Sequence, residues 1–155
     1  MASKHEPRIM EQAQSSLEPG ERVVAALWAR LRGASQQRAG SLASMAAGSI
    51  QSRKAARGAE AAQLDLPSPM ALAVTDRRLL VFGIATSGMG KPGDLKELAA
   101  SVPLVEVDSI QVKRLLVGKV LVLGVRGAEF KLEVAAGENA KGLAEAIERA
   151  KAAAA

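Results

Sequence analysis

Residues 71–74 and 79–82 are two short runs of apolar side chains, separated by the polar tetrad Thr75-Asp76-Arg77-Arg78. The runs are rich in Leu and Val, which favours strands. The Thr and Asp oxygens can accept hydrogen bonds from nearby backbone N–H groups, which favours a turn. The pattern therefore predicts a tight antiparallel hairpin.

Strand-like alternation is consistent from Val102 onward. Residues 105–107 and 110–112 each alternate apolar, polar, apolar, and the change of phase at Asp108-Ser109 predicts a bulge or a turn. A second hairpin is predicted about Arg126-Gly127, with arms at 119–126 and 128–134. In its second arm the even positions (Phe130, Leu132, Val134) are apolar and the odd positions are charged, as in a sheet with one dry face and one wet face.

Helical spacing marks both ends of the chain. Apolar side chains at 9, 10, 13 and 17 predict a short amphipathic helix that begins near Pro7. Near the other end, Asn139 can cap a helix that runs through Lys151 with Leu143 and Ile147 on its apolar stripe. Residues 152–155 are expected to fray.

The middle of the chain is less regular. Residues 21–32 fit either a helix by spacing or a strand by their flanking Gly residues. Residues 33–66 are rich in Ala, Ser, Gly, Gln and Arg, which predicts an insertion or a mobile helix, with a helical face over 42–50. The glycine-rich stretch 85–94 predicts a loop that matches no phosphate-binding motif.

Composition narrows the function classes. The chain has 155 residues, 48% of them hydrophobic but only 2% aromatic, so it lacks the aromatic platforms on which single-stranded nucleic acid stacks. It has no cysteine and one histidine, His5, near the N-terminus, so we expect no metal site. With neither a secretory signal nor an apolar run of membrane-spanning length, we expect a cytoplasmic protein.

Catalytic chemistry is not expected from these residues. Asp76, Asp94 and Asp108 are isolated in predicted turns, and a single terminal histidine cannot complete a Ser/His/Asp arrangement. We therefore expect no enzyme and no small-molecule substrate. The formal charge of +5 and the pI near 9.9 are a mild basic bias that favours anionic partners.

Two groups of cations are candidate sites for an anion or a lipid. Arg77 and Arg78 could clamp an anion at the hairpin turn, but two consecutive strand residues point to opposite faces, so we favour a structural turn. Arg53, Lys54 and Arg57 could attract an anionic membrane as part of an interfacial helix. Residues 42–57 carry few large apolar side chains and no aromatic residue, which favours a solvated or loosely docked insertion instead.

The order of several motifs resembles the small bacterial pleckstrin-homology-like (PH-like) or GRAM-like domains. The matching segments are Leu-Glu-Pro-Gly-Glu-Arg-Val-Val at 17–24, Ala-Val-Thr-Asp-Arg-Arg-Leu-Leu-Val at 73–81, Pro-Leu-Val-Glu-Val at 103–107, and Phe-Lys-Leu-Glu-Val at 130–134 followed by the last helix. The resemblance implies an α+β, mostly β fold: a partly open antiparallel barrel closed by a C-terminal helix. It also favours the strand interpretation of residues 22–32.

The resemblance sets the domain boundaries that we expect. Residues 1–16 are an N-terminal helical extension, 17–151 a single PH-like domain with an insertion at 33–66, and 152–155 a frayed tail. Lipid-binding members carry a lysine near the end of the first strand and a Lys/Arg-x-Arg group on the second. Here Arg30-Leu31-Arg32 closes the first strand and residues 70–74 hold no basic residue, so the resemblance does not carry phosphoinositide binding to this chain.

The resemblance implies a non-enzymatic domain without a cofactor, and some related bacterial domains assemble into rings. We therefore expect a binding or scaffolding domain that engages a protein segment, or its own copies, through an exposed strand edge or the groove between sheet and helix. Peripheral binding to an anionic membrane through the basic insertion is the alternative. Non-specific association with nucleic acid is a weaker alternative that rests on the pI alone.

Overall fold

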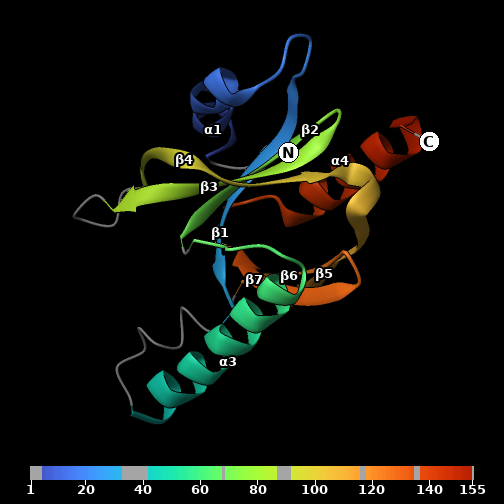
Figure 1. Cartoon of the computed structure of the whole chain (residues 1–155). Helices are drawn as coiled ribbons and strands as arrows, with labels where there is room; N and C mark the ends of the chain where they lie inside the picture. Colours follow the sequence, from blue (N-terminus) through green and yellow to red (C-terminus); the bar gives the residue numbers. More distant parts are fainter. Residues whose placement is uncertain are drawn as a thin grey trace.

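The computed structural model describes residues 5–32, 42–67, 69–86, 92–115, 118–134 and 137–154 (Figure 1). Its helices are α1 (Glu6–Ala13), α3 (Leu42–Ala61) and α4 (Ala140–Ala154), with 3-10 turns η1 (Gln14–Ser16) and η2 (Leu104–Glu106). Its strands are β1 (Val23–Leu31), β2 (Met70–Thr75), β3 (Arg78–Thr86), β4 (Pro92–Pro103), β5 (Val107–Arg114), β6 (Lys119–Val125) and β7 (Ala128–Val134). Among the described residues, no helix is long and apolar enough to cross a bilayer.

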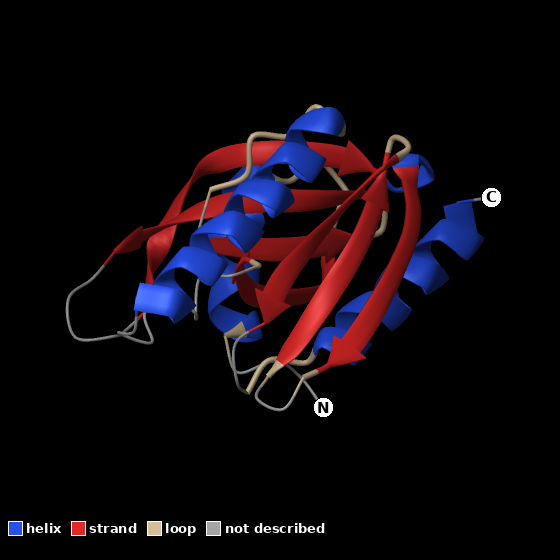
Figure 2. Cartoon of the chain, turned by 90° about the horizontal axis from the view of Figure 1, so that it is seen from below, coloured by secondary structure: helices blue, strands red, loops and turns tan. Residues whose placement is uncertain are grey.

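The strands form one antiparallel sheet in the order β4-β3-β2-β1-β7-β6-β5. β1 joins its two halves, because residues 23–29 pair with β2 and residues 29–31 pair with β7. The strand interpretation of residues 22–32 is therefore confirmed. Figure 2 shows the strands curving round, with the C-terminal helix α4 lying alongside one margin of the sheet.

Both predicted hairpins are confirmed. β2 and β3 pair as far as Val74 with Leu79, and β6 and β7 pair as far as Val125 with Ala128. The second hairpin turns through Arg126 (φ +51°) and Gly127 (φ +81°). Two successive positive φ angles characterise the type I′ turn, whose twist suits a two-residue hairpin.

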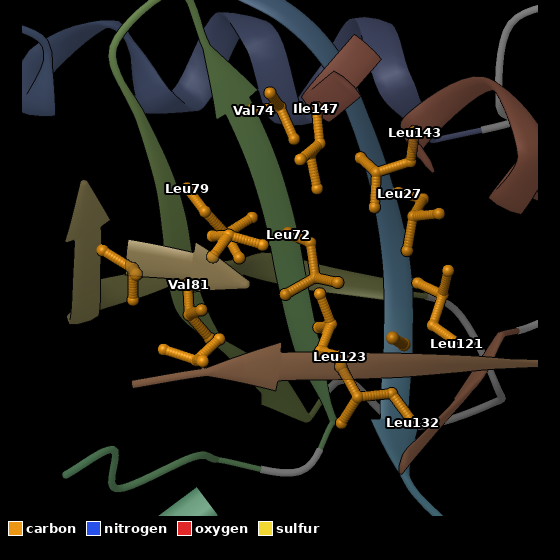
Figure 3. Packing of buried hydrophobic residues seen from close by; sticks show 14 of the residues in the cluster. Leu27, Leu72, Val74, Leu79, Val81, Leu121, Leu123, Leu132, Leu143 and Ile147 are labelled. Carbon is orange, nitrogen blue, oxygen red and sulfur yellow. The ribbon is translucent and has the colours of Figure 1, made fainter. Parts of the chain in front are cut away.

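The main core fills the space between the inner face of the sheet and α4 (Figure 3). The even positions of β7 are buried as predicted, and Ile147 of α4 is fully buried. Asn139 caps α4, because its Oδ1 accepts a hydrogen bond from Gly142 N at 2.9 Å. The helix ends at Ala154, three residues beyond the predicted end at Lys151, so the tail that we expected to fray is helical up to that residue.

A second cluster lies on the outer face of the β1–β4 half, where α1 covers the sheet. The N-terminal helix is confirmed, and its Ile9 and Ala13 are buried against Ala71 and Phe82. β2 is therefore buried on both faces. At one end of α1, the His5 ring stands edge-on to the ring of Trp28, with 5.3 Å between the ring centroids.

The insertion contains α3, which runs beneath β6 and β7 in Figure 1. Side chains at 42–49 lie outside the described residues, as does the predicted helical face that they would form, while Ile50 is 66% exposed. The C-terminal part of the helix is instead docked on the core through Ala55, Ala59 and Ala62. Gly58 permits the close approach, because a Cβ there would collide with the Glu129 carbonyl oxygen.

Two local predictions are wrong. Residues 85–86 and 92–94, expected in a loop, belong to β3 and β4, because the β3–β4 ladder continues as far as Thr86 with Pro92. Residues 87–91 of that predicted loop lie outside the described residues. Leu104–Glu106, expected in a strand, form the 3-10 turn η2, in which Leu104 is buried at the corner between β4 and β5. The predicted bulge is confirmed, because the β5–β6 register shifts between Val107 and Ser109.

We predict that Gly58→Val lowers the free energy of unfolding by about 2 kcal/mol, since the new side chain must push α3 away from the β7 backbone. Chemical denaturation measures the change. Ala61→Val is the matched control, because it places the same side chain at an exposed position of α3 and should stay within about 0.5 kcal/mol of the parent. Equal effects of the two substitutions would show that α3 is not packed through Gly58.

Candidate functional site

The turn between β2 and β3 contains a buried ion pair that the sequence motif did not reveal. Arg78 donates from Nε to Glu21 Oε2 and from Nη2 to Glu21 Oε1, both at 2.9 Å. The Glu21 side chain is fully buried, whereas Arg78 keeps 18% of its side chain exposed. The Thr75 hydroxyl donates to Glu21 Oε2 at 2.7 Å and accepts from the backbone N–H groups of Arg77 and Arg78.

Arg78 also binds two further segments. It donates from Nη1 to Ser101 Oγ at 3.0 Å and from Nη2 to the Ser16 carbonyl oxygen at 2.9 Å. The guanidinium thus joins the residues before β1, the β2–β3 turn, β4 and η1. Since these groups take most of its donors, Arg78 is oriented by the protein and does not project as an open anion clamp.

The ion pair shifts the acid–base equilibrium of its carboxylate. Hydrogen bonds from Arg78 lower the pKa of the Glu21 carboxyl from its ordinary 4.5 to about 2, with burial acting in the opposite direction and Glu18 N and Thr75 adding to the decrease. Because the folded-state pKa lies below the unfolded value, Glu21 stabilises the fold above about pH 4.5. This contribution is lost as the pH falls towards 2.

Arg77 has a different partner from its neighbour. It donates from Nη1 to Glu18 Oε2 at 3.2 Å, and both side chains of this pair are about half exposed. Asp76 Oδ1 accepts from Arg22 N, which ties the turn to the start of β1. The two arginines diverge, as expected, because one pairs with an exposed carboxylate and the other with a buried one.

The cations of the insertion lie elsewhere, along α3. Arg53, Lys54 and Arg57 are exposed on the helix, well away from the β2–β3 turn in Figure 1. Lys54 lines a pocket of about 290 Å³ between α3, the residue after β1 and β7. The other lining residues are Arg32, Ala55, Glu129, Phe130 and Lys131.

The pocket has a modest positive balance. Arg32, Lys54 and Lys131 contribute three cations, while Glu129 lines the wall and Glu133 pairs with Arg32 at 3.1 Å. Sequence reasoning missed Lys131 as a site residue, although the alternation of β7 placed it on the wet face. The missing information was that α3 docks beside that strand.

The last candidate surface is the outer edge of β5, which ends the strand order and, among the described strands, pairs with β6 alone. Ile110 and Val112 are half-buried and pack against the core, while Ser109, Gln111 and Lys113 are exposed. Lys151 of α4 donates to the Val107 carbonyl oxygen at 2.6 Å, so α4 is attached at the beginning of the strand. Leu115, just beyond the strand, is 39% exposed.

The acidic residues considered for catalysis have structural partners. Hydrogen bonds from Arg8 and then Gln12 lower the pKa of Asp94, which joins α1 to β4. Asp108 Oδ2 accepts from Gly127 N at 2.7 Å in the β6–β7 turn. Within the described part of the chain, no three histidine, aspartate or glutamate side chains gather as a metal site would require.

Comparisons with known proteins identify the architecture. No family model and no curated protein matches the sequence. A crystal structure of a DUF1696 family protein with a pleckstrin-homology domain, from Shewanella loihica, superposes with a TM-score of 0.51 and 12% sequence identity, covering 96% of this chain and 94% of that one. The likeness establishes the fold, and the predicted PH-like architecture is confirmed.

We predict that Glu21→Gln lowers the free energy of unfolding at neutral pH by about 3 kcal/mol, because it leaves the Arg78 guanidinium without its carboxylate. Denaturation at a series of pH values measures this loss. The parent should lose roughly 3 kcal/mol more than the variant between about pH 5 and pH 2.

Glu18→Gln is the matched control for that substitution, because it removes the exposed partner of Arg77 and should cost less than about 1 kcal/mol. Parallel acid profiles for the parent and Glu21→Gln would contradict the assigned ion pair.

Proposed function

From the PH-like fold, we propose that this chain is a non-catalytic binding domain that takes up an extended protein segment as an additional strand on β5. The observation that carries the proposal is the place of β5 at the end of the strand order, paired on one side with β6. A strand in that position presents backbone N–H and C=O groups to which an extended segment can hydrogen-bond.

The other end of the sheet is less suited to such a partner. The β3–β4 register shifts at three places, and bulges of this kind twist an edge away from regular pairing. The Leu95 N–H of β4 is already bound by Gln12 Oε1 of α1 at 2.7 Å. β5, in contrast, pairs with β6 without interruption from Ser109 to Arg114.

The side chains of β5 suggest which segments it would accept. Ile110 and Val112 share the face that packs on the core, so apolar residues at alternate positions of the segment would extend that core. Lys113 and Arg114, both exposed, favour acidic residues opposite the end of the strand. The expected partner is thus an extended, alternating segment with an acidic end.

A library of displayed random peptides, selected against the whole chain, tests this proposal. We expect the selected peptides to shift the amide NMR signals of Ser109–Lys113 and not those of β4. Lys113→Glu should weaken binding of the acidic peptides several-fold, because it reverses the facing charge. Lys96→Glu, at an exposed position of β4, is the matched control and should leave binding unchanged. Selected peptides that bind elsewhere on a monomeric chain would contradict the proposal.

A second candidate function is peripheral attachment to an anionic membrane through α3. The observation that favours it is the exposure of Arg53, Lys54 and Arg57 on one docked helix, with Lys54 beside the Arg32 and Lys131 of the pocket. Each cation near an anionic surface contributes about 1 kcal/mol at low salt. The attraction would be electrostatic, because the described side chains of α3 offer a single exposed large apolar residue, Ile50.

Co-sedimentation with phosphatidylserine vesicles measures this attachment. We predict that replacing Arg53, Lys54 and Arg57 with Ala weakens binding at low salt at least tenfold, and that salt abolishes the binding of the parent. The charge-matched control replaces Lys96, Lys141 and Arg149, which are exposed on β4 and α4. An equal loss in both triple variants would assign the effect to net charge, and a parent that does not sediment would exclude this function.

A further inference from the structure

The sequence of β5 is complementary to itself when the strand is reversed. We propose that the segment received by β5 is the β5 strand of a second copy of this chain, paired antiparallel about a two-fold axis at Gln111. This inference rests on the proposed use of the β5 edge and names its partner. It predicts a dimer in which the two sheets join into one.

The geometry of antiparallel pairing limits the available registers. Along a regular strand, both the side-chain face and the direction of the backbone hydrogen-bonding groups alternate from residue to residue. Residues directly opposite each other must share both. In a two-fold pair, one residue therefore lies directly opposite its own copy across the axis. Each candidate register is defined by that central residue.

The register centred on Gln111 places apolar side chains opposite each other on the inner face of the sheet. It places Ile110 of one copy opposite Val112 of the other, twice, and both side chains are half-buried on the face that packs on the core. It also places Ser109 opposite Lys113, so no equal charges face each other. The paired stretch ends at Ser109, because Asp108 lies in the bulge and its Oδ2 already accepts from Gly127 N.

Neighbouring registers lose this match. An axis at Ile110 would bring Val112 towards the Asp108 of the second copy, and an axis at Val112 would set Ile110 opposite Arg114. An axis at Lys113 would place two ammonium groups side by side, which destabilises a strand pair. The Gln111 register is the one of these four that gives both Ile110 and Val112 an apolar partner in the second copy without facing like charges.

The geometry of the contact also limits this association to two copies. The bulge at Asp108 ends the regular part of the edge, and Lys151 of α4 already binds the Val107 carbonyl oxygen. A two-fold contact uses the same edge of both copies, so the dimer has no free β5 edge to which a third copy could add. Dimerisation thereby covers the β5 edge, to which further strands could otherwise add without limit.

Charge substitution at the axis gives a sharp test. Gln111 is exposed, so Gln111→Lys and Gln111→Glu should each fold normally. Because the axis places residue 111 of both copies side by side, each variant alone should raise the dimer dissociation constant at least tenfold in sedimentation equilibrium. An equimolar mixture of the two variants should restore association as a heterodimer. Gln14→Lys, at an exposed position of η1, is the control and should dimerise like the parent.

Each other outcome overturns the inference. A parent that stays monomeric at all accessible concentrations has no such dimer. A Gln111→Lys variant that associates like the parent has its contact elsewhere, and a mixture that does not associate places the axis away from Gln111. The peptide selection separates this failure from that of the proposed function: peptides that bind β5 of a monomeric parent would retain the proposed edge and remove the second copy as its partner.

Discussion

The arrangement of the first half of the sheet depends on the buried pair of Glu21 and Arg78. A carboxylate with a fully buried side chain is costly without a partner, and here each oxygen receives a hydrogen bond from the guanidinium. The remaining bonds of Arg78 reach η1 and β4, and the Thr75 hydroxyl completes the turn. Three parts of the chain that are distant in the sequence, residues 16–21, the β2–β3 turn and β4, therefore meet at one cation, and this junction sets where the β2–β3 hairpin lies relative to β1.

Arg78, which a motif search would suggest as an anion-binding residue, thus holds segments of the fold together. Consecutive arginines at a turn suggest anion recognition, but they point to different carboxylates, one exposed and one buried. One group of accessible cations lies on α3 and beside it, where Lys54 and Lys131 line a common pocket. The two recognition surfaces that we propose therefore involve other residues, on α3 and along β5.

The sequence predicted the elements whose signals are local. The β2–β3 and β6–β7 hairpins carry their own turn residues, and α4 carries both its cap at Asn139 and its apolar stripe. β4 was missed, because three register shifts interrupt its alternation. The docking of α3 was also missed: it is made by Ala55, Gly58 and Ala59, and such small residues leave no periodic pattern of bulk. The burial of Glu21 depends on a residue more than fifty positions away, which no local window contains.

The covering of the outer sheet face by α1 gives the molecule a built-in optical signal. Trp28 is the only tryptophan of the chain, it packs against the cluster beneath α1, and it has the His5 ring and the Arg30 guanidinium within about 5.5 Å of its ring centre. Its indole emission is therefore expected to change when the N-terminal helix leaves the sheet. Fluorescence from the unaltered protein thus reports both on the seating of that helix and on the integrity of β1.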